Sequence, residues 1–535
     1  MVLIIRVEMK TIKNVPRDLA PLFLDRTSLD WAFNHVQRFG DSDIFPIPFE
    51  FAAYAAVWPA VRDYLAGVDL AHCEITGSLK MMVPKHSEGF RGATQLNPFD
   101  ALLYTALVFE SAEAIERFRK PKEVACAYRL EITKEGTLFQ KDSGWSQFHN
   151  TSKTLLESKD CEFVLCADIS DYYNQISHHR LQGALEQAGV DENRSKVIER
   201  FLGNVNALHH SRGIPVGPFV SILLAEVCLA DVDNFLSRKY SHTRYVDDFR
   251  VFCRSSEEAL QALHDLSEYL YTAHRLSLQA GKTKICTKDQ FRKDELSDPV
   301  AQEREAKEQR LEKITQELRK MGYPEPEEVA ADFVNEGEVA IAVLNELLET
   351  VLTRKYFPLA LGRFVLRRAA SLRCRAILPR VLGNVEKFIP VLRDLMLYLI
   401  KMARPRTHHP IGAALEHLIT RSDWRSFPFV QYWALTAIQQ VPEFANSEKG
   451  MAWSSQSDPS IRDRMLALTA RAYGLADWVR GKKETWSNTS IWAQRANIRA
   501  SSVLPREERG HWLQPIRNNP DRSISAVADA VFMSG

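Results

Sequence analysis

Short apolar runs typical of strands alternate with the apolar spacing of helices over about the first 290 positions of the chain. The strongest strand signals are Glu162–Ala167 and Thr243–Cys253, which are rich in residues that favour strands. Between them lies Ile222–Phe235, an apolar stretch that predicts a long buried helix. Strands and helices mixed in this way predict an α+β fold for residues 1–295.

The pattern changes after residue 295. Residues 296–334 carry charges of alternating sign along a thin apolar stripe, which predicts a solvated helical connector. From 335 to 535 helical spacing dominates and strand signals almost vanish. Prolines punctuate these leucine- and alanine-rich helices, which favours an all-α, solenoid-like (HEAT-like) domain of stacked helical pairs. A compact, irregular helical domain is the alternative.

Composition and charge narrow the class of protein. Hydrophobic residues make up 45% and charged residues 26% of the chain, as in ordinary globular proteins. The net charge of +1 neither supports nor excludes a nucleic-acid partner, because a basic groove can be local. The apolar run Val2–Ile5 is too short for a signal peptide or a membrane span. The eight cysteines form no C-x-x-C pair, which fits a reducing compartment. We therefore expect a cytoplasmic protein without a membrane partner.

Two adjacent aspartates, Asp247 and Asp248, follow Tyr245 and Val246 at the predicted tip of a hairpin of buried strands. Neighbouring carboxylates raise each other's pKa unless a cation lies between them. The pair therefore predicts a site for a divalent metal. A polar hairpin turn is the alternative, because aspartate is common in turns.

A third aspartate, Asp168, closes the strand predicted at Glu162–Ala167. If this strand lies beside the hairpin, Asp168 and Asp247 converge on one point. Two Mg²⁺ ions bridged by such carboxylates activate a 3′-hydroxyl and stabilise a departing pyrophosphate. Capping of the following helix is the alternative role for Asp168, although Asp171 fits that role better.

Two glycine-bearing turns are candidates for nucleotide contacts. Gly213–Ser221 is a stiff turn ahead of a helix, where Gly217 lets the backbone approach a ligand and Ser221 could face it. Pro84–Gly92 is a basic turn suited to gripping a triphosphate. A solvated surface loop is the alternative for the second turn.

Basic residues elsewhere suggest further contacts with phosphates. Leu276–Ile285 predicts a β-hairpin that carries Lys282 toward the aspartates, where it could neutralise or protonate a leaving pyrophosphate. A second basic group lies in the helical region, where it predicts either a solvated face or a groove for phosphates. It consists of Arg363, Arg367, Arg368, Arg373, Arg375 and Arg380.

The order of these segments resembles the reverse-transcriptase family of right-hand polymerases over about residues 80–290. The Asp168 strand matches the first acidic motif of the family, and Tyr245–Asp248 matches its Tyr-x-Asp-Asp box. The resemblance implies fingers and palm over residues 1–295 and transfer of dNTPs. It also implies two Mg²⁺ ions, for which Mn²⁺ can substitute. The implied catalytic metal ligands are Asp168, Asp247 and Asp248.

The same resemblance implies where a nucleotide binds. Tyr173 matches an aromatic gate whose ring would exclude a 2′-hydroxyl, so the product would be DNA. Arg91 would contact the triphosphate from the basic fingers. Val216 departs from the family, which commonly has glutamine there, and the lost polar contact argues against strict template reading. The implied nucleotide-binding residues are Lys85, Arg91, Tyr173, Gly217, Ser221 and Lys282.

A palm followed directly by a helical domain resembles the bacterial abortive-infection and defence-associated reverse transcriptases. That resemblance implies antiphage defence through template-independent DNA synthesis primed from a protein hydroxyl. The single-stranded DNA product would then be covalently attached to the protein, which would form a homo-oligomer.

Two other functions remain open. An RNA-templated reverse transcriptase working with a noncoding RNA, as in retrons, is the main alternative. Asn206–His210 superficially matches a retron signature, but it lies between the Asp168 and Gly213 motifs rather than upstream of both. A non-catalytic nucleic-acid-binding scaffold is disfavoured, because all three expected carboxylates are present.

Overall fold

The computed structural model describes residues 19–86, 89–206, 211–296, 334–354 and 356–534. Residues 297–333 of the connector expected at 296–334, and residues 207–210 of the Asn206–His210 segment, therefore lie outside the described residues. Within the described residues, no helix is long and apolar enough to cross a lipid bilayer.

An antiparallel sheet of four strands, in the order β4-β5-β3-β6, forms the platform of the site. Its strands are β4 (Ser241–Tyr245), β5 (Asp248–Cys253), β3 (Phe163–Asp168) and β6 (Lys284–Thr287). The central strand β3 is buried over Val164 to Ala167, because helices α6 (Trp145–Leu156) and α12 (Ser256–Tyr269) pack against the sheet. Asp168 lies opposite Asp248, which confirms that the two acidic segments are neighbours.

Two local predictions need correction. The helix expected over Ile222–Phe235 is divided at Leu229 into α10 (Ser221–Cys228) and α11 (Ala230–Leu236). The hairpin expected over Leu276–Ile285 is only partly formed: Leu278 makes an isolated bridge with Ile169, and a strand begins only at Lys284. Between them the backbone N–H groups of Lys282 and Thr283 both donate to the carbonyl oxygen of Gln279, so this segment is a tight turn.

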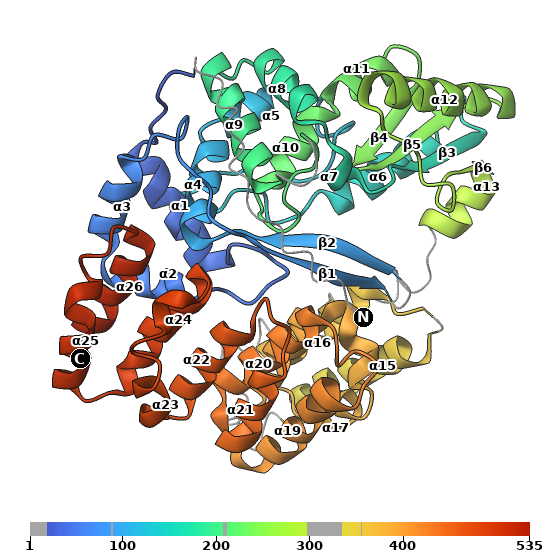
Figure 1. Ribbon diagram of the computed structural model, residues 1–535. Coiled ribbons are helices and arrows are strands. Elements are labelled where there is room, and N and C mark those ends of the chain that lie inside the picture. Colours follow the sequence, from blue (N-terminus) through green and yellow to red (C-terminus); the bar gives the residue numbers. More distant parts are fainter. Residues whose placement is uncertain (1–18, 87–88, 207–210, 297–333, 355, 535) are drawn as a thin grey trace, which may run out of the picture.

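A two-stranded hairpin and a group of helices precede and flank the sheet. In Figure 1 the hairpin runs across the middle of the molecule, between helices α7–α10 and the C-terminal helices. It consists of β1 (Leu79–His86) and β2 (Gly89–Gln95). The helices are α1 (Arg26–Phe39), α2 (Phe49–Ala56), α3 (Trp58–Ala66), α4 (Pro98–Phe109), α5 (Ala112–Phe118), α7 (Tyr172–Gln175), α8 (His178–Gln187) and α9 (Glu192–Val205).

The described residues from 334 onward form helices and no strands, which confirms the all-α prediction for this part of the chain. One row of helices packs each on the next but one in sequence. The row is α16 (Leu359–Ser371), α18 (Leu392–Lys401), α20 (Pro428–Gln440), α22 (Arg462–Ala472), α24 (Ile491–Ala500) and α26 (Arg522–Met533). The other helices include α15 (Val334–Thr353), α17 (Leu378–Leu382), α19 (Pro405–Thr420), α21 (Ser447–Ser455), α23 (Ala476–Arg480) and α25 (Arg506–Ile516). The solenoid itself stays a prediction.

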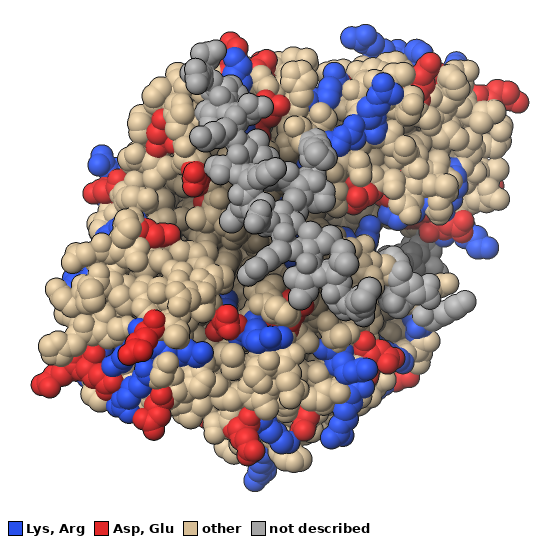
Figure 2. Space-filling view, viewed as in Figure 1, with Lys and Arg blue, Asp and Glu red and all other residues tan. Residues whose placement is uncertain are grey.

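The C-terminal helices are fastened to the N-terminal part at two places. At the first, Leu79, Met81 and Val83 of β1 are buried in the same core as α18 and α20. At the second, α26 packs against α2. The N-terminal part and the C-terminal helices therefore share hydrophobic cores. On the face shown in Figure 2, basic and acidic side chains are intermixed over the C-terminal helices.

Candidate active site

The turn between β4 and β5 presents Asp247 from a strained backbone. Val246 has φ = +54°, a left-handed conformation that β-branched residues rarely adopt. Two hydrogen bonds hold the turn: Arg244 Nη1 donates to the Val246 carbonyl oxygen (2.8 Å), and the Ile169 N–H donates to the Asp247 carbonyl oxygen (3.1 Å). The second bond ties the turn to the end of the Asp168 strand. The site is therefore preorganised by its backbone.

Arg244 holds this turn from inside the protein. Its side chain is fully buried, with Nη2 donating to Asp233 Oδ2 at 2.6 Å and Nη1 donating to Glu226 Oε1 at 3.1 Å. Paired charges of this kind lock a guanidinium in one orientation. Sequence reasoning missed Arg244 as a positioning residue. The available signal was an arginine one position before the Tyr-x-Asp-Asp motif, inside a strand that is otherwise buried.

The three predicted aspartates lie at one end of the sheet. Burial, followed by the charge of Asp168, raises the pKa of Asp247 to about 6. Burial also raises the pKa of Asp248 to about 7; the charge of Arg250 opposes this rise and that of Asp168 adds to it. Burial and mutual repulsion disfavour the charged forms of these carboxylates, and a nearby cation therefore stabilises them. In this structure one cation is Lys282, whose Nζ donates to Asp168 Oδ1 (3.0 Å) and Oδ2 (2.9 Å).

The donor set suits a divalent metal in kind, because carboxylate oxygens are the ligands that Mg²⁺ and Mn²⁺ prefer. Within the described residues, no group of three or more His, Cys, Asp or Glu side chains already has the spacing of a metal centre. The Lys282 ammonium takes up both oxygens of Asp168 in this arrangement. The aspartates therefore fit a divalent ion, because carboxylate oxygens are suitable ligands and the three side chains lie at the same end of the sheet. Lys282 supplies positive charge at the same place.

A cavity of about 510 Å³ opens over the aspartates. Its wall contains most of the residues predicted to bind a nucleotide, which come from the β1–β2 hairpin, α7 and the turn before α10. Among the residues that line it are Lys85, Arg91, Asp168, Tyr173, Val216, Gly217, Asp247 and Asp248. The tertiary structure therefore brings together predicted site residues that are up to 163 positions apart, from Lys85 to Asp248, and lining residues that are up to 320 positions apart, from Asp43 to Arg363.

Gly217 is required by its surroundings. Its φ is +142°, and a Cβ at this position would lie 3.0 Å from Ser42 Oγ and 3.0 Å from the Thr94 carbonyl oxygen. The neighbouring Val216 carbonyl oxygen accepts a hydrogen bond of 2.9 Å from the Thr94 N–H of strand β2. The turn before α10 is thus pressed against the hairpin that carries Arg91.

Two of the residues predicted to bind a nucleotide, Ser221 and Lys282, are not among those that line the cavity. Ser221 is fully buried, and its Oγ shares a hydrogen bond of 3.0 Å with Tyr104 Oη, so it faces the core rather than the cavity. Lys282 is about half exposed and reaches Asp168 from the tight turn. Asp171 begins α7 as its N-cap residue, as expected, but its carboxylate accepts from Asn174 Nδ2 at 2.7 Å instead of from the helix backbone.

The cavity wall also includes residues that sequence reasoning did not place there. Asp43 lies ahead of the family-like segment, and Arg363 comes from α16 in the C-terminal region. Arg363 belongs to the basic group of the helical region, but nothing in its local sequence connects it to the aspartates. Its position depends on how the C-terminal helices fold back over the hairpin.

A wider groove of about 770 Å³ adjoins the cavity and shares Lys85 and Arg91 with it. Lys80 and Arg212 also line this groove, together with amides such as Asn174 and Gln175. Cations and amides of this kind contact the backbone of nucleic acids. The groove could therefore hold a strand beside the cavity.

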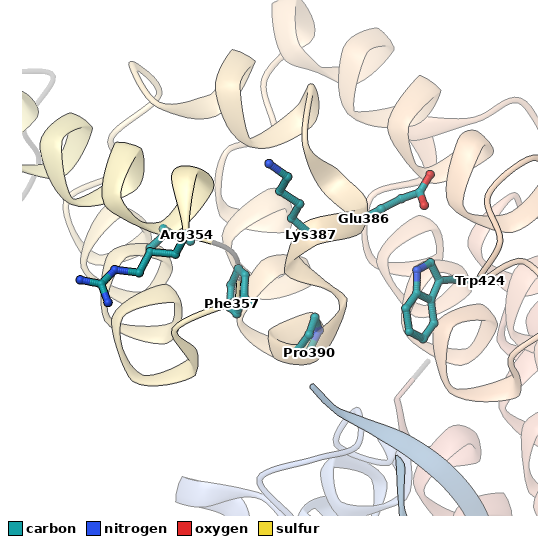
Figure 3. A pocket seen from close by; sticks show the side chains of 7 residues that line it. Arg354, Phe357, Glu386, Lys387, Pro390 and Trp424 are labelled. Atoms are coloured by element: carbon teal, nitrogen blue, oxygen red, sulfur yellow. The ribbon is translucent and has the colours of Figure 1, made fainter. Parts of the chain in front are cut away.

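The C-terminal helices contain a small cavity of about 140 Å³, lined by Arg354, Phe357, Lys387 and Trp424 among others. Figure 3 shows these side chains around it, with a strand of the hairpin passing below. Trp424 also contacts Phe90 of the hairpin, with ring centroids 6.0 Å apart. The small cavity thus lies next to the junction between the C-terminal helices and the hairpin.

One family model matches the part of the chain that contains these aspartates. The family model described as "Reverse transcriptase (RNA-dependent DNA polymerase)" matches residues 83–323, which include all three aspartates. Similar solved structures include the telomerase from Candida albicans in complex with a fragment of telomeric RNA. It is 12% identical, with 78% of this chain and 71% of that chain covered and a TM-score of 0.31.

Another is the apo telomerase from Candida tropicalis, which is 10% identical, with 71% of this chain and 68% of that chain covered and a TM-score of 0.31. No curated protein matches the chain. Reverse-transcriptase domains act on nucleotides and generally use divalent metal ions. The match over residues 83–323 therefore shows that the chain contains a reverse-transcriptase domain, and this domain is a nucleotidyltransferase of the RNA-directed DNA polymerase family.

Proposed function

We propose that this protein is a DNA polymerase of reverse-transcriptase type that acts in bacterial antiphage defence. It adds dNTPs by two-metal nucleotidyl transfer, without a template and from a primer hydroxyl on the protein itself. The observation that carries the polymerase part is the cavity of about 510 Å³, which is lined by the three aspartates, by Lys85 and Arg91 of the hairpin and by the Tyr173 ring. The defence role rests on the resemblance of the domain order to that of defence-associated enzymes.

Each side chain has a defined role in this proposal. Asp168, Asp247 and Asp248 hold two Mg²⁺ ions, and Mn²⁺ can substitute. When bound, the ions lower the pKa of the attacking hydroxyl and neutralise charge on the leaving pyrophosphate. Lys85 and Arg91 bind the triphosphate through charge-assisted hydrogen bonds.

Two further residues act on the sugar and on the leaving group. The Tyr173 ring lies under the sugar and excludes a 2′-hydroxyl, so deoxynucleotides are selected. Lys282, which lies 2.9 Å from Asp168, moves its ammonium from that carboxylate to the leaving pyrophosphate and donates a proton there.

Synthesis without a template is supported by the wall of the cavity. Val216 stands there with an apolar side chain, which packs partly against the core of the C-terminal helices. A valine side chain has no donor or acceptor for a hydrogen bond with a template strand or a base. The C-terminal helices take the place of a thumb in this proposal, and the protein works as a homo-oligomer whose DNA product remains attached.

The groove of about 770 Å³ supports a second candidate, an RNA-templated reverse transcriptase that works with a noncoding RNA. Lys80 and Arg212 lie in that groove, and Lys85 and Arg91 connect it to the cavity. A strand bound there would enter the site beside the nucleotide. This candidate predicts a product of defined sequence.

The test is DNA synthesis by purified protein with Mg²⁺ and dNTPs, with and without added RNA and primer. The main proposal expects DNA that forms without additions and stays with the protein after denaturation. DNA that forms only with an added template and primer would support the second candidate instead. Asp247→Asn should abolish synthesis while the protein stays folded, and EDTA should do the same. Asp160→Asn, on an exposed turn before β3, is the matched control and should retain activity.

A further inference from the structure

Arg363 stands in the wall of the catalytic cavity although it belongs to α16, outside the segment that matches the reverse-transcriptase family. Both Arg363 and Arg91 line the cavity, although Arg363 lies 272 positions after Arg91 in the sequence. Helix α16 is firmly seated, because Val365, Leu366 and Ala369 are completely buried. The C-terminal region therefore contributes a fixed cation to the site.

The arginines at this wall are incompletely paired. Among the described residues, neither Arg91 Nε nor Arg363 Nε has a hydrogen-bond partner, although both atoms are buried. Arg363 Nε lies 3.8 Å from Oδ2 of Asp394. That carboxylate is already hydrogen-bonded to Arg367 Nε at 2.7 Å. Arg363 is thus held near Asp394 but keeps capacity for another anion.

The charges of this group are out of balance. Burial lowers the pKa of Arg91, and although the charge of Asp43 opposes this, that of Arg363 adds to it. The pKa of Arg393 is also lowered, chiefly by burial. The charges of Asp394 and Asp43 oppose this lowering. Arg91, Arg363 and Asp43 line the cavity, and Arg367, Arg393 and Asp394 belong to the same charge network, so that four arginines interact with two carboxylates. Such an excess of partly buried positive charge favours a multivalent anion.

We propose that Arg363 binds the triphosphate of the incoming nucleotide together with Arg91, so that the C-terminal helical region completes the nucleotide site. The inference rests on the proposed function, because it takes dNTPs as the substrate. A guanidinium matches phosphate oxygens with two parallel hydrogen bonds, and two guanidiniums can span adjacent phosphates. In this arrangement the C-terminal region is a working part of the polymerase site.

The first experiment compares steady-state kinetics of Arg363→Gln and Arg368→Gln with those of the wild type. Arg368 is the matched control: it lies on the same helix, and its guanidinium stands over the Phe364 ring at 5.8 Å rather than in the cavity. Loss of charge-assisted hydrogen bonds should raise KM for dNTPs about 10- to 100-fold in Arg363→Gln. Arg368→Gln should leave KM unchanged.

Inorganic triphosphate is the second probe, because it has no base or sugar. It should inhibit the wild type in competition with dNTPs, and its inhibition constant should rise in Arg363→Gln by about the same factor as KM. A dNMP, which lacks the outer phosphates, should inhibit both proteins equally. This pattern separates a contact with the triphosphate from a structural effect.

The possible results separate the two proposals. DNA synthesis by the wild type with equal KM values for wild type and Arg363→Gln would overturn the inference and leave the proposed function standing. If the wild type makes no DNA, the proposed function fails, and calorimetric binding of inorganic triphosphate to wild type and Arg363→Gln still decides the role of Arg363. If Arg363→Gln does not fold, Arg363→Lys replaces it. Arg363→Lys keeps the positive charge but loses the paired N–H groups of the guanidinium. An unchanged KM for dNTPs in this variant would therefore also overturn the inference.

Discussion

Glu50 is expected to fasten the C-terminal helices to the N-terminal part of the protein, and its removal should be costly. This carboxylate is fully buried in α2. Its two oxygens accept hydrogen bonds from Arg464 Nη1 (2.7 Å) and Nη2 (2.8 Å), and Oε1 also accepts from Arg495 Nε (3.0 Å). Glu50→Gln keeps the size of the side chain but removes the negative charge between two buried guanidiniums. The junction that keeps the C-terminal region in place should weaken.

The magnitude follows from the structure by two routes. Burial raises the pKa of Glu50, but the charges and hydrogen bonds of Arg464 and Arg495 outweigh it and lower the pKa from 4.5 to about 2. At about 1.4 kcal/mol per pKa unit, this lowering corresponds to roughly 3 kcal/mol of folding free energy. Breaking a buried ion pair by removing one partner costs about 3–5 kcal/mol, which agrees. We expect Glu50→Gln to destabilise the protein by about 3 kcal/mol at pH 7.

Thermal unfolding measures this effect. Because the two parts share cores, the chain of 535 residues has an unfolding entropy of about 1.1 kcal/mol per kelvin, and a loss of about 3 kcal/mol should lower the midpoint by roughly 3 °C. Because the folded-state pKa is depressed, the stabilisation is complete above pH 4.5 and is lost as the pH falls toward 2. The difference between wild type and variant should therefore shrink below pH 4.5.

Glu192→Gln is the control for this experiment. Glu192 pairs with Lys196 on the surface, where its side chain is 71% exposed, so its replacement should leave the midpoint nearly unchanged. Equal midpoints for Glu50→Gln and Glu192→Gln at pH 7 would refute the reasoning.

Three other variants test how the site is held. Arg244→Lys should lower the single-turnover rate constant about 10-fold, because lysine lacks the two guanidinium N–H groups that hold the catalytic turn and Asp233. An unchanged rate constant would contradict the positioning role. Phe90→Ala removes the ring stacked on Phe427 at 5.3 Å and should raise KM for dNTPs about 2- to 10-fold, and an unchanged KM would show that this contact does not position the hairpin. Gly217→Ala should lower the unfolding midpoint, because its Cβ would lie 3.0 Å from the Thr94 carbonyl oxygen; a midpoint equal to that of the wild type would argue against this clash.

The sequence predicted the parts of the site that depend on short-range pattern. The strands ending at Asp168 and flanking Asp247 form where apolar and β-branched residues predicted them, and Asp168 lies opposite Asp248. The prediction failed at Ser221, whose side chain turns into the core toward Tyr104. Which face of a helix is buried depends on what packs against it, and Tyr104 comes from a distant helix.

Val246 and Arg244 show a different limit. The Tyr-x-Asp-Asp pattern indicated a turn, but the left-handed backbone at Val246 is sustained by the guanidinium of Arg244, which is itself held by Asp233 and Glu226. A buried ion network of this kind joins a strand to α10 and α11. Local sequence does not say which charges will meet when helices and strands pack together.

The sequence by itself determined the chemistry at the centre of this protein, because adjacent aspartates at a strand turn and a third at a strand end are local features. It also determined that the C-terminal part is helical, because the spacing of apolar residues is local as well. Only the tertiary structure decided that Lys282 pairs with Asp168 and that Arg363 enters the catalytic cavity. The first contact exists because the turn before β6 is hydrogen-bonded to the end of β3, where the Gln279 N–H donates to the Asp168 carbonyl oxygen. The second exists because the buried faces of the hairpin and of the C-terminal helices share one apolar core.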